Sequence, residues 1–213
     1  MLAIAGGKGG SGKTTTALGL ARALDGPTLV ADADVDMPDL HALAGVDREP
    51  TLADLDGRPP DAVAQPRPGA EGVSVLPAPR ATDDADPGAA LARVAAADVP
   101  ALLDCPGGAG PDAAAPIRAA DRALLVAGAC VPALRDAAKT AAMARALGTD
   151  VVGAVLTRTT AAPPAVADVL GCPVLGTVPE VDPPVLPRRV TRTAYARLAS
   201  ALAAGQGILR SGP

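Results

Sequence analysis

The sequence of 213 residues contains no phenylalanine, no tryptophan and a single tyrosine, Tyr195. With 49% hydrophobic residues and a mean hydropathy of +0.27, it still has enough apolar material for a sizeable core, which excludes global disorder. Alanine, valine, leucine and isoleucine must fill that core. A bound nucleotide base would therefore be held by aliphatic side chains and main chain, because a single tyrosine is the only Phe, Trp or Tyr ring in the sequence.

Other scarce residue types exclude several classes of protein. The three cysteines, Cys105, Cys130 and Cys172, are odd in number and widely spaced, so they indicate neither a disulfide framework nor a Cys-x-x-Cys metal site. We interpret them as small hydrophobic residues. The only histidine, His41, is expected to be structural, and no Ser/His/Asp or Cys/His arrangement can be assembled. A net charge of −4 disfavours a uniformly basic nucleic-acid binder.

The sequence also lacks the signals of a membrane or exported protein. It begins without a signal peptide, and no apolar run approaches 18 residues without a charge, glycine or proline. We therefore expect no spanning helix and a cytoplasmic protein. Residues 205–213 are broken by glycines, and we expect them to form a flexible tail.

Short, continuously apolar runs alternate with alanine-rich stretches of helical length, which predicts strands buried on both faces and connected by helices. We therefore predict an α/β fold, a single domain over residues 1–213 with a mostly parallel sheet and helices on both faces. The expected strands are Leu2–Ala5, Thr28–Ala31, Val73–Leu76, Ala101–Leu103, Ala123–Ala127, Val151–Leu156 and Val174–Val178. The expected helices are Thr14–Leu24, Asp39–Ala44, Gly88–Ala97, Asp112–Ala119, Ala133–Leu147, Pro164–Leu170 and Thr193–Ala203.

Two connecting segments are rich in turn-forming residues. The segment Asp56–Gly72 contains four prolines and is expected to be the least ordered part of the chain, either a mobile surface loop or a plain connector. A second soft stretch is expected at Pro77–Gly88. Ligands in sheets of this kind bind beyond the carboxyl ends of the strands, where the motifs described next are placed.

The clearest motif is a glycine-rich loop that follows the first strand and opens the first helix. Its pattern is G-x-x-x-x-G-K-[ST], and that strand–loop–helix context is the one that a phosphate-binding loop requires. The glycines let main-chain N–H groups converge on phosphate oxygens at a helix N-terminus. Lys13 is expected to contact the β- and γ-phosphates, and the Thr14 hydroxyl is expected to bind Mg²⁺. The predicted contact residues are Gly7, Lys8, Gly9, Gly10, Ser11, Gly12, Lys13, Thr14 and Thr15.

Lysine usage supports this interpretation. Arginine supplies nearly all of the positive charge, yet two of the three lysines, Lys8 and Lys13, lie in the loop. A compact, flexible ammonium suits a site beside phosphate better than a planar guanidinium. The form K-G-G-x-G-K-T-T resembles the deviant Walker A motif of MinD/ParA P-loop ATPases, archaeal MinD-like proteins in particular. The resemblance implies that Lys8 reaches the phosphates of a second subunit.

An acidic segment follows the second strand and resembles the D-x-D motif of the same family. The resemblance implies that Asp32 supports the magnesium shell and that Asp34 positions the attacking water. Two carboxylates at i and i+2 of a strand end point the same way and can meet one hydrated Mg²⁺. For Asp36 and Asp39 we instead expect an acidic turn that caps the following helix.

A third acidic position, Asp104, ends an apolar strand before a Cys-Pro-Gly-Gly sequence and resembles the Walker B and switch II segment. It is expected to hold Mg²⁺ through water, followed by glycines that let the loop respond to the γ-phosphate. Lys8, Lys13 and Asp34 are thus the expected catalytic residues, and Thr14, Asp32 and Asp104 the expected metal-binding residues.

The resemblance extends over most of the chain but weakens at the base site and at the C-terminus. Thr157 stands where relatives have an asparagine that reads adenine, followed by Arg158, and Pro179 lies in a loop expected near the base. A guanine-reading motif is absent, so we expect ATP. Asp136 is either a partner contact or an exposed first-turn residue. Segment 205–213 carries one charge, which disfavours the membrane binding of MinD tails.

The sequence leaves three functions open. The first is a Mg²⁺-dependent ATPase that forms a homodimer with ATP bound and positions division proteins, a chromosome or other cargo through an unknown partner. The second is a DNA-binding partition protein that uses the arginines Arg188, Arg189, Arg192 and Arg197, although solvated helix charges are the favoured interpretation of these residues. The third is an ATP-binding regulator with slow turnover. Iron–sulfur scaffold ATPases and synthetases are disfavoured, because their cysteine or substrate motifs are missing.

Overall fold

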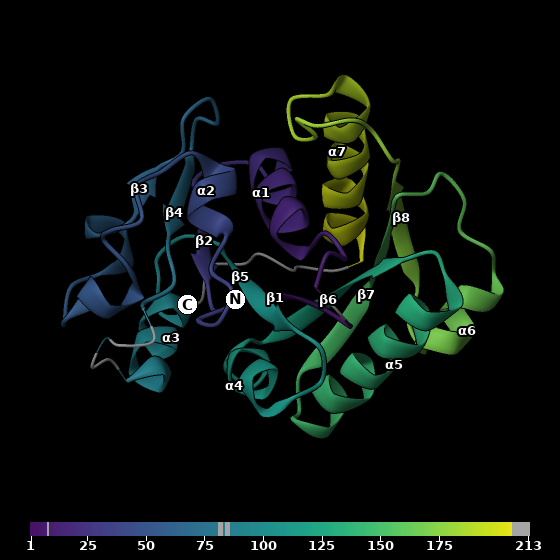
Figure 1. The fold of residues 1–213 in the computed structure, drawn as a ribbon, viewed down its shortest axis with the longest axis horizontal. Coiled ribbons are helices and arrows are strands. Elements are labelled where there is room, and N and C mark those ends of the chain that lie inside the picture. Colours follow the sequence, from purple (N-terminus) through teal and green to yellow (C-terminus); the bar gives the residue numbers. More distant parts are fainter. Residues whose placement is uncertain (8, 81–82, 84–85, 206–213) are drawn as a thin grey trace.

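The computed structural model describes residues 1–7, 9–80, 83 and 86–205. Within them an α/β domain is built on an eight-stranded sheet of order β3-β4-β2-β5-β1-β6-β7-β8 (Figure 1). All neighbouring strands are parallel except the antiparallel pair β3 and β4. The strands are β1 (Leu2–Gly6), β2 (Thr28–Asp32), β3 (Gln65–Pro66), β4 (Val73–Leu76), β5 (Ala101–Gly107), β6 (Arg122–Gly128), β7 (Asp150–Thr157) and β8 (Val174–Val178). The predicted fold class is confirmed.

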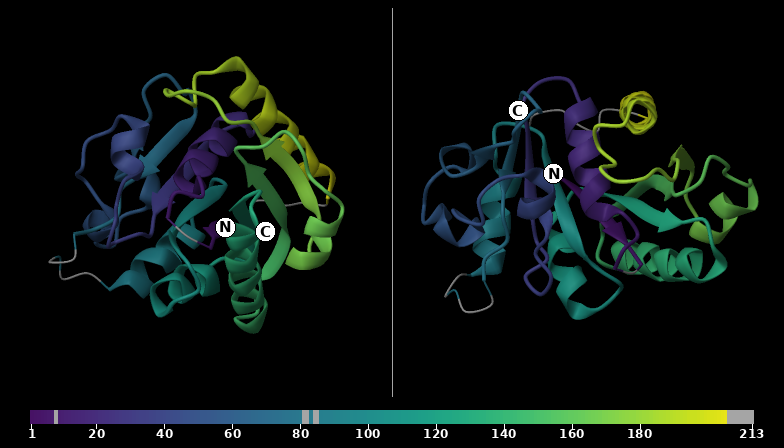
Figure 2. Two further views of the ribbon diagram at one scale, coloured as in Figure 1. Left: turned by 45° about the vertical axis from the view of Figure 1, so that its right-hand side comes forward. Right: turned by 45° about the horizontal axis from the view of Figure 1, so that its top comes forward.

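Helices cover both faces of this sheet, as Figures 1 and 2 show. The helices α1 and α7 pack on one face, whereas α3, α4 and α5 pack on the other. The helices are α1 (Lys13–Ala23), α2 (Leu40–Ala44), α3 (Pro87–Ala95), α4 (Pro111–Ala119), α5 (Val131–Ala146), α6 (Ala165–Leu170) and α7 (Arg189–Ala204). Two 3₁₀ helices, η1 (Leu52–Leu55) and η2 (Pro60–Ala62), complete the description. No helix in these described ranges is both long and apolar enough to span a bilayer.

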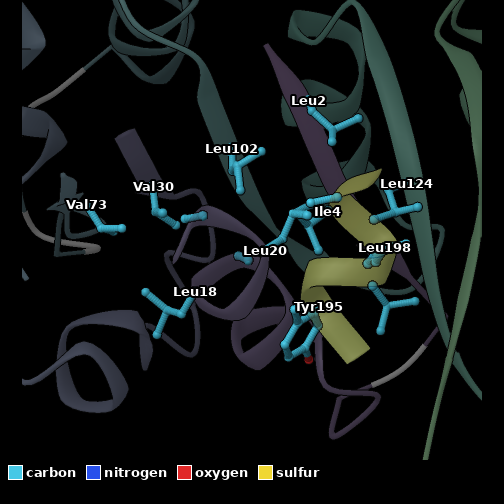
Figure 3. Packing of buried hydrophobic residues seen from close by; sticks show 14 of the residues in the cluster. Leu2, Ile4, Leu18, Leu20, Val30, Val73, Leu102, Leu124, Tyr195 and Leu198 are labelled. Carbon is cyan, nitrogen blue, oxygen red and sulfur yellow. The ribbon is translucent and has the colours of Figure 1, made fainter. Parts of the chain in front are cut away.

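The central strand β1 shows how one short apolar run serves two cores. Its successive side chains point to opposite faces. Leu2 and Ile4 are buried with α1 and α7, whereas Ala3 and Ala5 are buried with the helices of the opposite face. Figure 3 shows Leu2 and Ile4 in the cluster that also contains Leu198 of α7. The absence of polar positions in this strand thus follows from burial on both faces.

Two element boundaries differ from the sequence prediction by four residues each. Strand β5 extends to Gly107, four residues beyond the predicted end, because its main chain continues to pair with β1 through Asp104 and up to Gly107. Helix α7 begins at Arg189, four residues before the predicted start at Thr193. Its first turn buries Thr191, a polar residue that hides the apolar period continued by Tyr195 and Leu198.

The segment Asp56–Gly72, expected to be the least ordered, is a packed connector with its own elements. It contains η2 and β3, and it buries Val63 and Ala70 against the two cores. The main-chain N–H of Arg67 donates to the carbonyl oxygen of Val73 at 2.8 Å. Proline content identified a connection here but missed the edge strand, which is only two residues long. The second stretch, Pro77–Gly88, lies partly outside the described residues.

The contact between α1 and α7 depends on one glycine. A Cβ atom at Gly19 would lie 2.3 Å from two ring carbons of Tyr195, closer than packed atoms can approach. Tyr195 is 1% exposed, so its ring cannot swing into solvent without opening the core. The single tyrosine therefore fits against α1 because residue 19 lacks a side chain.

We predict that Gly19→Ala destabilises the protein by about 1–3 kcal/mol, despite the better helix propensity of alanine, because the buried ring must shift. The free energy of unfolding in urea measures this. Gly88→Ala is the matched control: it is also helical, but its Cβ would meet only the exposed Asp86 side chain, at 3.2 Å. That variant should stay within about 0.5 kcal/mol of the parent. Equal stabilities of the two variants would contradict the assigned contact.

Candidate functional site

A cavity of about 770 Å³ opens beyond the carboxyl ends of the central strands. The structure brings together there most of the residues that the sequence predicts to contact a nucleotide. Those that line it are Gly9, Gly10, Ser11, Gly12, Lys13, Thr14, Thr15, Asp34, Asp104, Thr157, Arg158 and Pro179. Gly7 and Asp32 lie behind its wall, and the predicted residue Lys8 lies outside the described residues.

The glycine-rich loop has the main-chain geometry that its composition predicts. Gly10 and Gly12 have φ angles of 75° and 92°, a left-handed conformation that glycine adopts without strain. Gly12 is the N-cap of α1, so Lys13 and Thr14 begin the helix. Behind the loop, a Cβ atom at Gly7 would lie 2.4 Å from the Cβ of Asp136 on α5. Gly7 thus supports the loop through close packing instead of lining the cavity.

Lys13 and Asp104 form the charged centre of the cavity. Lys13 is 8% exposed and Asp104 is 2% exposed. Within the described residues, Oδ1 of Asp104 is buried and has no hydrogen-bond partner. Burial raises the pKa of Asp104 well above its usual value and the charge of Asp32 adds to this, whereas the nearby Thr14 hydroxyl and the charge of Lys13 lower it. A cation bound here would stabilise the ionised carboxylate.

Asp32 lies on β2 in register with Asp104 on β5. Its carboxylate accepts hydrogen bonds from the main-chain N–H of Asp34 at 2.9 Å and of Leu40 at 3.4 Å. Burial raises the pKa of Asp32 to about 7, although both hydrogen bonds lower it. The structure thus places Asp32 behind the cavity, where it fixes the chain that carries Asp34.

Asp39 corrects one expectation from the sequence. It occupies the N-cap position of α2, but its side chain makes no capping hydrogen bond. Instead, its Oδ1 accepts a 3.0 Å hydrogen bond from the hydroxyl of Thr14. Sequence reasoning missed this residue because the contact spans 25 positions. The only signal was the family pattern, in which an asparagine or aspartate precedes the leucine that is Leu40 here.

The oxygen atoms that face this cavity determine whether magnesium fits it. The Thr14 hydroxyl and the orphaned Asp104 oxygen are hard ligands of the kind that Mg²⁺ prefers. Among the described residues, no group of three or more acidic, histidine or cysteine side chains is arranged to hold a metal. The residues therefore fit an ion that takes its other ligands from phosphate and water.

Thr157 and Arg158 end β7 at the side of the cavity. The Thr157 hydroxyl donates to the carbonyl oxygen of Ser11 at 2.8 Å, which ties β7 to the phosphate loop. Arg158 has a left-handed φ of 56° and an exposed side chain. The hydroxyl of Thr157 is thus engaged by the loop, while the neighbouring aliphatic wall contains Leu43, Val178, Val181 and Val185.

Comparison with known proteins identifies the family of this chain. Residues 2–183 match the family model described as the CobQ/CobB/MinD/ParA nucleotide binding domain. The chain belongs to this family. It is 36% identical over 200 residues to an uncharacterized ATP-binding protein of Methanocaldococcus jannaschii, a match that covers 86% of this chain and 75% of that protein.

Solved structures of the family share the whole fold. The cell division ATPase MinD of Pyrococcus furiosus superposes with a TM-score of 0.81 at 28% identity, covering 95% of this chain and 98% of that one. The septum site-determining protein MinD of Pyrococcus horikoshii, complexed with Mg-ADP, gives a TM-score of 0.80 at 27% identity and covers 93% of each chain. The MinD/ParA fold and ATP binding expected from the loop motif are thus supported independently.

Two features of this family member were not foreseen. Tyr195 also lines the cavity, although the composition led us to expect only aliphatic side chains and main chain there. Its hydroxyl shares a 3.3 Å hydrogen bond with Thr16 of α1. Asp136 is not an exposed first-turn residue: it is half-buried, packs against Gly7 and pairs with Lys139 at 3.1 Å.

The arginines proposed for DNA binding have different surroundings in the structure. Arg188 donates to the carbonyl oxygens of Asp182 and Pro183 in its own loop. Arg189 and Arg192, in the first turn of α7, instead line a second, smaller cavity. The fourth, Arg197, is an exposed residue further along α7.

Because Tyr195 is the only tyrosine, its ionisation can be followed by phenolate absorbance. Burial raises the pKa of Tyr195 to about 12, although the hydrogen bond with Thr16 lowers it. The folded state therefore favours the neutral phenol, and this contribution to stability is complete below the unfolded pKa of about 10 and is lost as the pH rises towards 12. We predict a midpoint near pH 12 for the folded protein.

The same titration in strong denaturant is the control and should give a midpoint of about 10. Circular dichroism recorded alongside identifies any alkaline unfolding. A midpoint near 10 in a protein that is still folded would contradict the buried position of the ring.

Proposed function

We propose that this chain is a Mg²⁺-dependent ATPase in which ATP binding joins two copies and hydrolysis separates them. The observation that carries the proposal is a nearly buried lysine at the end of the glycine-rich loop, whose charge acts on a buried, partly unsatisfied carboxylate in the same cavity. That arrangement suits a magnesium-bound triphosphate, whose phosphates match Lys13 and whose metal matches Asp104.

The phosphate-contacting roles follow from the positions of the groups. The N–H groups from Gly9 to Thr15 are proposed to surround the phosphates at the start of α1, with Lys13 against the β- and γ-phosphates. The loop is held in this shape by Gly10 and Gly12 and by the hydrogen bond from Thr157. A preformed set of donors costs no reorganisation when charge develops during phosphoryl transfer.

The metal-binding roles are assigned to three oxygen-bearing side chains. Thr14 and Asp104 are proposed to hold Mg²⁺, which would neutralise phosphate charge, and Asp32 supports that shell from behind. Because the Thr14 hydroxyl is bonded to Asp39 in the structure, it must exchange that partner to bind a metal. Asp39 would then accept a hydrogen bond from a metal-bound water, which keeps it in the site as a positioning residue.

Asp34 is proposed to orient the attacking water. It lines the cavity, and its Oδ1 accepts the main-chain N–H of Met37 at 3.0 Å. That bond and the one from its own N–H to Asp32 fix the direction of the carboxylate. An Asp34 side chain held from both sides can align water for in-line attack without itself changing charge.

The base is proposed to be adenine, held by the aliphatic wall and main chain around Pro179, with Arg158 at its edge. The engaged hydroxyl of Thr157 means that recognition would depend on main-chain groups instead of an asparagine amide. The M. jannaschii relative is an ATP-binding protein by name, which supports ATP as the ligand.

Lys8 is proposed to contact the phosphates of the second copy, and the cytoplasmic task would be to position division proteins, a chromosome or other cargo through an unknown partner. The MinD relatives of Pyrococcus support this class of task. ATP-dependent DNA binding and slow regulatory turnover are the alternatives. Single-turnover kinetics would identify a slow regulator, because its hydrolysis rate would remain low even when every nucleotide site is filled.

The three lysines of the chain give a direct test. Lys13→Ala should weaken Mg-ATP binding by about 10- to 100-fold, because a charge-assisted contact to the phosphates is lost. Lys8→Ala should bind Mg-ATP with nearly the affinity of the parent but fail to dimerise with ATP. Lys139→Ala removes an exposed lysine from α5 and is the matched control. Calorimetry and light scattering measure the two properties, and full ATP-driven dimerisation of Lys8→Ala would refute its role.

Asp104→Asn should separate metal binding from nucleotide binding. The variant keeps the volume of the side chain but loses its charge, so the gain in ATP affinity on adding magnesium should shrink by about tenfold or more. Affinity for ATP in magnesium-free buffer should hold or rise, because a buried negative charge near the phosphates is removed. Asp36→Asn, an exposed change in the same cavity, is the control. An undiminished magnesium effect in Asp104→Asn would exclude Asp104 as a metal-binding residue.

A further inference from the structure

A second cavity, of about 510 Å³, lies between α1, α7 and the connection from β3 to β4. Four arginines from three separate segments line it: Arg22 in the last turn of α1, Arg67 after β3, and Arg189 and Arg192 in the first turn of α7. The sequence placed two of these in a surface patch, but Arg22 and Arg67 join them only through the fold.

The positive charge of this cavity is uncompensated within the described part of the chain. Its lining contains no aspartate or glutamate, and none of the four arginines forms an ion pair there. Arg67 is half-buried; its Nη1 donates to the carbonyl oxygen of Leu18 at 3.0 Å, and its Nε is buried without a partner. Burial lowers the pKa of Arg67, and the nearby charge of Arg22 lowers it further. Arg22 and Arg67 therefore repel each other.

The helix that supplies two of these arginines adds to the repulsion. The N-terminus of α7 carries the positive end of its dipole, a position that favours acidic side chains. Its first turn contains no acidic residue and instead has Arg189 and Arg192. An anion in the cavity would offset the helix end and all four guanidinium groups at once.

We propose that this cavity binds a compact, soluble anion with two or more phosphate groups. Four guanidinium groups around one recess call for more than a single negative charge, and their planar forks match phosphate oxygens. The half-buried Arg67 favours a small ligand that can enter the recess. The straight backbone of a DNA duplex would meet the exposed Arg22, Arg189 and Arg192 but not the half-buried Arg67.

The proposed anion site is separate from the nucleotide site but adjoins it. Tyr195 lines both cavities, and its hydroxyl bonds Thr16 one turn beyond the phosphate loop. No arginine of the second cavity lines the first among the described residues. The two sites can therefore be tested independently.

The experiment is calorimetric titration of inorganic pyrophosphate into the protein in magnesium-free buffer with ADP in excess. We expect saturable binding of one pyrophosphate per chain. Arg192→Gln and Arg67→Gln should each weaken it by about tenfold or more, because a charge-assisted contact is lost. Arg192 is exposed, so its variant tests the site even where loss of the Leu18 contact affects the folding of Arg67→Gln.

Two matched variants locate the binding. Arg93→Gln removes an exposed arginine from α3, outside the cavity, and should leave the affinity unchanged. Lys13→Ala alters only the phosphate loop and should also leave it unchanged. Loss of pyrophosphate binding in Lys13→Ala would place the anion in the nucleotide site and overturn the proposal, as would equal affinity in the parent and Arg192→Gln.

Two further arms separate soluble phosphates from larger phosphate carriers. A random-sequence DNA duplex and vesicles containing phosphatidylglycerol are tested with the same parent and Arg192→Gln proteins. Pyrophosphate binding without arginine-dependent binding of either supports the proposal. Arginine-dependent binding of the duplex or the vesicles, with no pyrophosphate binding, would overturn it and assign the surface to nucleic acid or lipid.

Discussion

Two buried carboxylates and one nearly buried ammonium are the constraint on which the site depends. Asp32 and Asp104 lie in register on neighbouring strands, and Lys13 is the cation beside Asp104. Burial raises the pKa of both carboxyl groups, so in the free protein their ionised forms are disfavoured. A bound metal and triphosphate would complete the charge balance. Ligand binding and the local stability of this region are therefore coupled.

The same region depends on two glycines, at which any side chain would clash with a neighbouring element. Gly7 lets the phosphate loop rest on α5, and Gly19 lets α1 rest on the ring of Tyr195. These contacts hold α1, which begins with Lys13 and Thr14, from two sides. A chain without phenylalanine or tryptophan thus achieves close packing through main-chain approach and one large ring, in a core otherwise filled by small aliphatic residues.

Much of this could be predicted from the sequence because the signals were local. Seven strand runs and the loop beside Lys13 are contiguous patterns, and the acidic segments were placed correctly towards the carboxyl ends of their own strands. The failures involved long-range contacts. Asp39 bonds Thr14 instead of capping its own helix, and Thr191 is a buried polar residue that concealed the first turn of α7. The two-residue strand β3 is defined only by its pairing with β4.

The choice of cation distinguishes the two cavities. Lysine is rare in this chain, and Lys13 stands where a flexible point charge must fit within a curled main chain. The second cavity has arginines at all four of its cationic positions, with more open walls and donors arranged in forks. A lysine at position 67 carries its three donors on one rotatable nitrogen, so it could not bond Leu18 and face an anion in the fixed planar geometry of a guanidinium. The difference between the two cation types thus follows from how tightly each site must enclose its phosphates. Tyr195 lines both cavities and forms part of the wall between them.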